Sequence, residues 1–423
     1  MWAHLFRGCL LCLLLVLVGC GGGGGPVPGN GGGNGPSSTT ITATFPSNAV
    51  PNSVAVQTGT NPFVSVPVNS NVVTFTVPSG TTKYAIAVVF LNFEGPQNFE
   101  FIFAATLQDG TSIQPTCGLQ CLSNSPVPTD SATGGFDASA IPGVSEVEIS
   151  GRNGTGTNVN AASSSFNIKL ATGINDVALT ATPFGSFPVL AAKIVRNQTV
   201  PGAINGGNTI TLGSADLITT QPLTVTNIAP GFSPPIISVS YFTANTGFPL
   251  SSNSTNSTQY PVVPAASAQT GDGYIFNLST ASPPPSSQIN FTLSSTTAAG
   301  GPFTIAMPDP LTFSGPAPSA FPTFTFDYPP VAGFANVSRS AEINWLQGPG
   351  PIFTDFTIDI AATPSFLNGA NTISIPNLSG LPGFIVPPSG TSVGWKASIS
   401  GATAPGPNST QIIATNHGSY TVP

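Results

Sequence analysis

Two pairs of closely spaced carboxylates have a spacing that catalysis could use. Glu146 and Glu148 are two positions apart, and Asp355 and Asp359 are four positions apart. Even spacing along an extended strand places both members of a pair on one face, and two facing carboxyl groups are the machinery of glycoside hydrolysis. In both segments that face is the polar one, which is typical of a sheet face turned to water. The pattern therefore favours solvation over catalysis.

Nucleophilic catalysis lacks the residue types that it needs. A nucleophile requires a base and an orienting group, and His417 is the only histidine after residue 4. Residues 390–394 match Gly-x-Ser-x-Gly, but that motif works between a strand and a helix. Here a loop pattern precedes it and a strand pattern follows, so we interpret the match as chance and His417 as a solvated edge residue. The sequence predicts no catalytic residue, no cofactor and no enzymatic activity.

Few residues in the sequence are candidates for metal ligands. Asp109, Asp176 and Asp272 stand beside Gly or Asn and could bind calcium in loops, but no Asp-x-Asp loop accompanies them. Turn formation is the simpler interpretation of such pairs. Cys117 and Cys121 lie close together, and in an oxidising compartment such a pair most often forms a small disulfide loop. A metal site would need two further ligands, so we expect the disulfide in preference to metal or redox chemistry.

The N-terminus carries the strongest motif. An apolar run from Leu10 to Val18 ends in Leu-Val-Gly-Cys20, and a five-glycine tract follows at once. The run is too short to span a bilayer and a small residue precedes the cysteine. This segment resembles the signal peptide and lipobox of a bacterial lipoprotein; a plain secretory signal and a transmembrane helix are the alternatives.

The lipoprotein resemblance implies a location. In that family the signal is removed before the cysteine, here Cys20, whose thiol receives a diacylglyceryl group and whose amine usually receives a palmitate-like chain. More than one chain makes a durable anchor. Gly21 stands where an Asp would retain such a protein in the inner membrane. We therefore expect a lipid-anchored protein of the cell envelope, at the outer membrane or cell surface, with the membrane as its first partner.

The amino-acid composition limits the classes of partner that the protein can bind. The 423 residues include 8 basic and 15 acidic side chains, a net charge of −7, and only 5% are charged, against about a quarter in ordinary soluble proteins. Nucleic acid is excluded because it would need a basic stripe. Acid denaturation arises mostly because carboxylates that are paired in the folded state become protonated. A chain with so few carboxylates is expected to tolerate low pH.

Strand patterns with Gly and Pro between them recur along the body, and 44 Pro and 47 Gly leave little room for helices. We predict an all-β fold of two or three tandem antiparallel β-sandwiches. Two segments, 114–142 and 251–259, are expected to be long loops. The expected organisation is a signal peptide at 1–19, the lipidated cysteine and a flexible Gly/Pro/Ser stalk at 20–40, and sandwiches at 41–184, 185–307 and 308–423.

The predicted units resemble immunoglobulin-like and fibronectin type III modules in strand count and spacing. That resemblance implies Trp345 and Trp395 as core aromatics of the last unit. The inter-sheet cysteine pair of antibody domains is absent. The segment Leu378–Phe384, followed by Trp395, is also similar to closing segments of bacterial surface lipoproteins.

The sequence therefore favours a non-catalytic surface lipoprotein with a structural, adhesive or envelope-associated role. Its partners would be other envelope proteins or cell-surface glycans. The alternative is a carbohydrate- or peptidoglycan-binding module, and an enzyme comes third. Sugar sites commonly use exposed aromatic side chains as stacking platforms. Exposure of Trp345 or Trp395 would favour binding, and burial of both would count against it.

Overall fold

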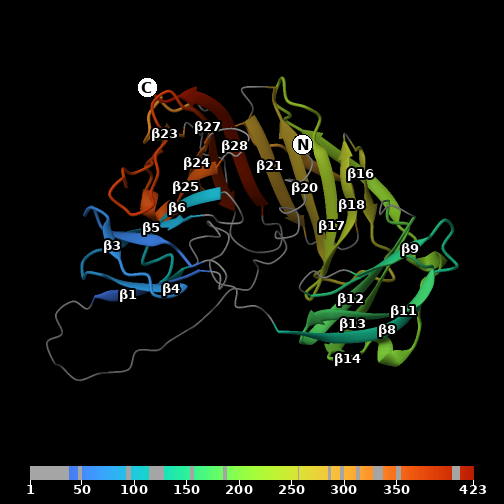
Figure 1. The fold of residues 1–423 in the computed structure, drawn as a ribbon. Helices are drawn as coiled ribbons and strands as arrows, with labels where there is room; N and C mark the ends of the chain where they lie inside the picture. The colour runs from blue at the N-terminus through green and yellow to red at the C-terminus, as the bar shows by residue number, and fades with distance from the viewer. Residues whose placement is uncertain are drawn as a thin grey trace.

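The described part of the chain is almost entirely β-structure. The computed structural model describes residues 38–45, 50–91, 97–113, 128–152, 157–183, 188–255, 257–283, 287–295, 300–310, 315–326, 337–348, 354–402 and 410–423. Within these ranges there is one short helix, α1 (Pro364–Leu367), and two 3-10 turns. Several sheets stack as sandwiches (Figure 1), so the all-β class expected from the sequence is confirmed.

One large sheet runs through the molecule and takes strands from the beginning, middle and end of the chain. All its described neighbours pair antiparallel except β6 and β25, which pair parallel over eight residue pairs. In spatial order its twelve described strands are β18 (Gly247–Thr255), β17 (Ile236–Phe242), β20 (Gly273–Ala281), β21 (Ser287–Ser295), β28 (Thr410–Thr421), β27 (Ser392–Ala402), β24 (Val337–Gln347), β25 (Thr354–Ala362), β6 (Gln97–Thr106), β5 (Lys83–Phe90), β2 (Ser53–Thr58) and β3 (Val64–Val66).

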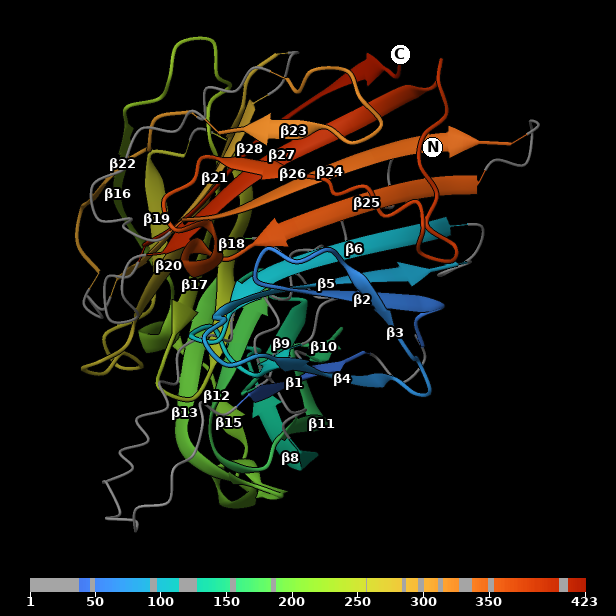
Figure 2. The same ribbon diagram turned by 90° about the vertical axis from the view of Figure 1, so that its left-hand side faces the viewer.

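Smaller sheets cover this large sheet or stand beside it. Figure 2 shows β1 and β4 below β2 and β5, and the green strands at one end. These sheets are β4 (Val72–Val77), β1 (Thr39–Thr44) and β7 (Ser112–Ile113); β10 (Thr157–Val159), β9 (Glu146–Ser150), β12 (Gly173–Thr182) and β13 (Ala191–Val200); β11 (Ser163–Ala171), β8 (Thr129–Asp137), β14 (Gly202–Ala203) and β15 (Ile210–Thr211); β19 (Gln259–Val262), β16 (Thr219–Thr226) and β22 (Phe303–Ala306); and β23 (Thr323–Thr325) with β26 (Thr372–Ser374).

The residue pattern of each strand follows the number of its faces that are covered. In β4 the sequence VVTFTV alternates exposed and buried, because only one face meets a core. In β5 the sequence KYAIAVVF is buried from its second residue onward. Both faces of β5 are covered, since Tyr84, Ile86 and Val88 pack toward β1 and β4, whereas Ala85 and Ala87 belong to the cluster on the opposite face. A strand buried on both faces needs a continuous apolar run.

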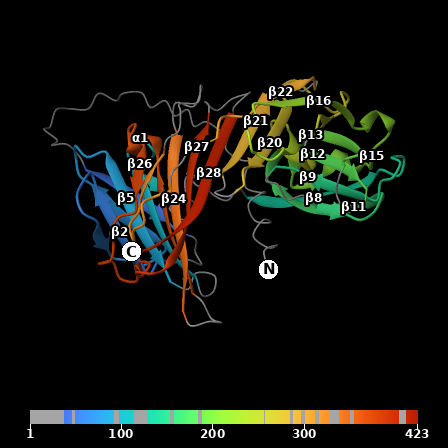
Figure 3. The ribbon, with the colours of Figure 1, turned by 90° about the horizontal axis from the view of Figure 1, so that it is seen from above.

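The described apolar side chains form four clusters. One lies between β1–β4 and the β2–β5–β6 part of the large sheet, and another covers the opposite face of that sheet under β23, β26 and residues 375–386. A third lies between β16–β19–β22 and the β17–β20 part. The fourth lies between the β9–β12–β13 and β8–β11 sheets. Seen from above, β28 and β21 lie between the two sides of the molecule (Figure 3).

Two of the loop predictions made from the sequence are wrong in part. Residues 129–137 of the segment 114–142 form β8, which pairs with β11 over nine residues, and residues up to Thr255 of the segment 251–259 belong to β18. The sequence of β8, TDSATGGFD, has few apolar residues. A partner strand supplies the missing apolar cover: the ring of Phe166 lies over Gly134, 2.6 Å from where a Cβ would stand. The boundaries at 184 and 307 stay a prediction, because shared sheets do not show which segments fold independently.

Gly418 offers a direct test of packing on the large sheet. A Cβ at this position would stand 2.7 Å from Cζ2 of Trp395, whose indole is buried on the neighbouring strand β27. Gly418→Ala must displace this ring, and overpacking of this kind costs about 1–3 kcal/mol. Chemical denaturation measures the loss. Gly213→Ala is the matched control, because no atom lies within 4 Å of its added Cβ; equal stability of both variants would contradict this packing.

Candidate functional site

A row of charged side chains crosses the polar face of the large sheet. Asp359 on β25 lies directly opposite Glu342 on β24, Glu342 opposite Lys396 on β27, and Lys396 opposite His417 on β28. Such cross-strand neighbours have Cβ atoms about 4.5–5.5 Å apart. The structure thus brings together Asp359 and His417, which the sequence selected separately, and adds Glu342 and Lys396.

Within this charged row, the pKa of Asp359 is shifted. Burial and the neighbouring Glu342 carboxylate raise the pKa of Asp359 to about 7, while Lys396 opposes the shift. Burial and Glu342 also raise the pKa of Asp355, which lies four residues back on the same strand. Asn344 donates from Nδ2 to Oε1 of Glu342 at 3.1 Å. The charged row can therefore take up a proton near neutrality.

Geometry argues against catalysis at the charged row. Lys396 and His417 are exposed, and Glu342 and Asp359 are half-buried. His417 pairs with Lys396 of β27, and its exposure confirms the solvated position expected from the sequence. Ser392 of the Gly-x-Ser-x-Gly match begins strand β27 and precedes no helix. A carboxylate pair on an open sheet face lacks the water exclusion that active sites use.

Two of the three aspartates considered as calcium ligands meet at one arginine, and one of them, Asp176, lies on a strand instead of the expected loop. Arg196 contacts Asp176 at 3.2 Å and Asp272 at 2.5 Å, with its side chain 13% exposed. Its Nη2 also donates to the Ser267 carbonyl at 2.6 Å. Tyr241 donates to Asp272 at 2.8 Å. Because Asp176 lies on β12 and Asp272 precedes β20, this arginine cluster joins the β9–β12–β13 sheet to the large sheet.

The third loop aspartate, Asp109, has a similar joining role. It accepts hydrogen bonds from Thr363 Oγ1 at 2.8 Å and Ser365 Oγ at 2.6 and 2.5 Å, across more than 250 residues. Burial opposes its ionisation, but bonds from Ser365, Thr106 and Thr363 outweigh burial and lower its pKa. Calcium is not needed to explain any of these three carboxylates. In the described residues no group of three or more His, Cys, Asp or Glu could hold a metal ion.

The remaining carboxylate pair lies on β9. Glu146 is buried and Glu148 is half-buried, on the face opposite core residues Val147 and Ile149. Both are paired with threonines of β12. Burial and the Glu146 carboxylate raise the pKa of Glu148. The shared face expected from the spacing is confirmed, but the expected solvation is wrong for this pair, because the face is largely covered.

Trp345 and Trp395 are core residues. Trp345 is 3% and Trp395 is 7% exposed, and the Trp345 ring stacks on Phe356 with centroids 5.2 Å apart. The expectation that they belong to a core is confirmed, and neither ring can serve as an exposed stacking platform, which counts against a sugar site built on these two tryptophans. Cys20, Cys117 and Cys121 lie outside the described residues. No helix in the described residues is long and apolar enough to cross a membrane.

Comparison with known proteins adds little to this geometry. No protein-family model matches the chain, and no curated protein matches it in sequence. Among solved structures, the crystal structure of chicken CNTN1 FN1-FN3 domains is similar at a TM-score of 0.14 and 7% identity, over 88% of this chain and 90% of that one. That score is too low to argue from.

Glu100 is a buried carboxyl outside the charged row. It is 2% exposed, accepts a bond from the Ile385 N–H at 2.7 Å through Oε1, and leaves Oε2 without a partner. Burial raises its pKa to about 8, partly opposed by the Ile385 bond. Since the unfolded group ionises near pH 4.5, the folded state binds the extra proton between these values. Its contribution to stability is therefore largest in acid and falls as pH rises from about 4.5 to about 8.

Glu100→Gln removes this ionisation. The variant is expected to be more stable than the wild type at pH 8, by about 2–4 kcal/mol, and close to it at pH 4.5. Denaturation at a series of pH values measures the difference. A variant that follows the wild-type pH profile throughout would contradict the buried, protonated Glu100.

Arg196→Met tests the arginine cluster. The change leaves Asp176 and Asp272 buried without their counter-charge, so it is expected to cost about 3–5 kcal/mol at neutral pH in chemical denaturation. Lys169→Met is the control, because its bridge to Asp130 joins two exposed side chains, 63% and 47% exposed, and its loss should cost about 1 kcal/mol or less. Similar losses in both variants would show that the cluster has no special role.

Proposed function

We propose that the protein is a non-catalytic scaffold of the bacterial cell surface, anchored by lipid on Cys20 and carrying a structural or adhesive face. The observation that carries the proposal is the large sheet, which joins strands from Ser53 to Thr421 by main-chain hydrogen bonds. A body joined in this way passes mechanical load between its two ends without relying on a flexible linker.

The placement of the charges supports a structural role. Asp109, Asp176, Asp272 and Arg196 each bond to elements more than 60 residues away in sequence. The charged groups that remain on the polar sheet face are few and lie in one row across β25, β24, β27 and β28. A face of this kind suits contact with polar envelope partners, and the Gly-rich segment that precedes β1 would hold it away from the lipid.

The lipid anchor is tested by fractionation with intact-mass measurement. Wild-type protein is expected in the membrane fraction, with an N-terminus at Cys20 that carries diacylglyceryl and acyl mass. Cys20→Ser is expected in the soluble fraction, because it lacks the acceptor thiol. Cys117→Ser is the matched control and should remain in the membrane fraction. An uncleaved or unmodified wild-type N-terminus would contradict the proposal.

A further inference from the structure

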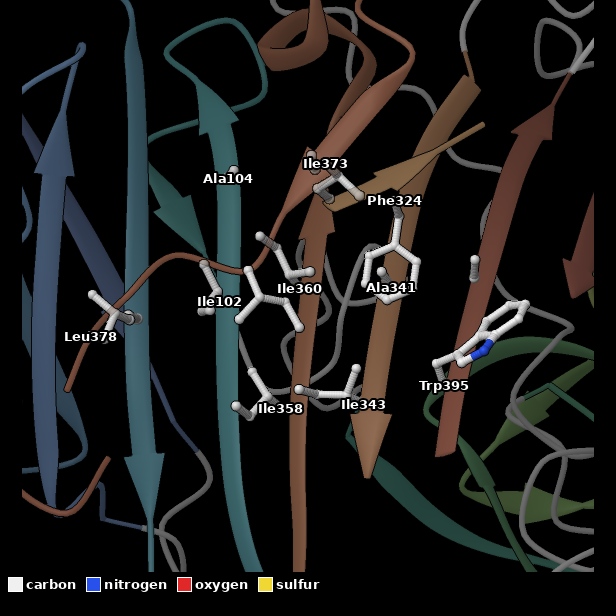
Figure 4. Packing of buried hydrophobic residues seen from close by; sticks show 14 of the residues in the cluster. Ile102, Ala104, Phe324, Ala341, Ile343, Ile358, Ile360, Ile373, Leu378 and Trp395 are labelled. Atoms are coloured by element: carbon white, nitrogen blue, oxygen red, sulfur yellow. The ribbon is translucent and has the colours of Figure 1, made fainter. Parts of the chain in front are cut away.

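A cavity of about 550 Å³ lies on the face of the large sheet opposite the charged row, near its β2–β3 end. Its floor is formed by β2, β5, β6 and β25. The segment that carries Ile373 and Leu378 crosses over β6 and β5, and the labelled Ala104 lies on β6 beside it (Figure 4). This cavity shares no residue with the charged row or the arginine cluster.

Small residues in register create the hollow. Gln57 lies opposite Ala85, Ala85 opposite Ala104, and Ala104 opposite Ala362, so three of four neighbouring strands supply a methyl group to the same row. Further along the sheet the corresponding row contains Ile102 and Ile360. These two isoleucines also line the cavity and bound it on that side, whereas the alanines leave the sheet surface open beneath the crossing segment.

The walls combine two aromatic rings with neutral polar groups. Phe63 and Phe366 are half-buried, and Lys83 Nζ stands 5.0 Å from the centroid of the Phe366 ring. The Gln57 side-chain amide donates a hydrogen bond from Nε2 to the Asn61 carbonyl at 2.8 Å. The side-chain carbonyl oxygen of Gln57 remains available to accept from a ligand. The other polar side chains of the lining are Ser65, Thr372, Ser374 and Asn377, and no acidic or basic side chain lines the cavity.

We propose that this cavity binds a neutral saccharide of a few residues. A sugar ring presents apolar C–H faces, which fit the alanine floor and the phenylalanine rings, and hydroxyl groups, which fit the amides and hydroxyls of the rim. A charged ligand would lose hydration with no counter-charge in the lining. An alkyl chain could use the apolar floor and the phenylalanine rings but would gain no hydrogen bond from the amides and hydroxyls of the rim. The volume lies within the range of small-molecule sites.

The crossing segment is held in place before any ligand arrives. Ser53 Oγ donates to the Pro382 carbonyl at 2.6 Å, and the Ile385 N–H donates to Glu100. Leu378 and Leu381, which line the cavity, are buried in the same segment. A preformed wall spares the ligand the cost of ordering it. This inference goes beyond the scaffold role and does not depend on the lipid anchor.

Isothermal titration and saturation-transfer NMR test the proposal on the full chain. The probes are the neutral trimers of glucose and of N-acetylglucosamine, with 1-decanol and decanoate as comparison ligands. At least one trimer is expected to bind at millimolar concentration or below, and neither comparison ligand is expected to bind. Gln57→Ala with Asn377→Ala should weaken binding about tenfold or more, because two rim hydrogen bonds are lost.

Two further variants distinguish loss of ligand contacts from a general loss of folded structure. Phe63→Ala should weaken the same trimer, and Asn371→Ala, an exposed amide close in sequence that does not line the cavity, should leave its affinity unchanged. The proposal is overturned if no trimer binds, if decanol binds in place of sugar, or if Asn371→Ala weakens binding as much as the rim variants. Each of these results would leave the membrane-fraction test untouched.

Discussion

The parallel pairing of β6 with β25 is the interaction on which the rest of the architecture depends. It joins two segments about 260 residues apart in the sequence, through eight residue pairs from Asp355 with Gln97 to Ala362 with Ala104. Without it the N-terminal strands β2, β3, β5 and β6 would form a separate sheet, and the cavity floor would be divided at β6. Forming such a distant contact costs loop-closure entropy. The apolar cover on both faces of β6, by Phe101 and Phe103 on one side and Ile102 and Ala104 on the other, offsets that cost.

Charge is scarce in this protein, and several of its buried charged groups lie where separate elements meet. Asp109 receives hydrogen bonds from the start of α1, Arg196 bridges Asp176 and Asp272, and Glu100 holds the segment that crosses the cavity. A buried polar group is costly unless it is paired, so each pairing favours one arrangement of neighbouring sheets over alternatives. The raised pKa values of Glu100 and Asp359 have a further consequence. Both groups favour the folded state in acid, in keeping with the acid tolerance expected from the low carboxylate count, while Asp109, whose pKa is lowered, acts in the opposite direction.

Local patterns in the sequence were sufficient for the strands and for the polar face, and insufficient for long-range pairing. Alternation identified β4 and β27, and even spacing placed Asp355 and Asp359 on one face. Strand β8 was missed because its cover comes from Phe166 on another strand. Neither the neighbours Glu342 and Lys396 nor the meeting of Asp176 with Asp272 follows from spacing, since both depend on which strands pair. The alanines at 55, 85, 104 and 362 were a visible signal, but only register turns them into one floor.

Native-state hydrogen exchange across the β6–β25 pairing tests the central claim most directly. If this pairing makes one continuous sheet, the amides of residues 99–104 and 356–361 should share a single high opening free energy and lose protection together as denaturant is added. Exchange of the β6 amides through a separate, lower-energy opening, while β24, β25 and β27 keep their protection, would contradict it.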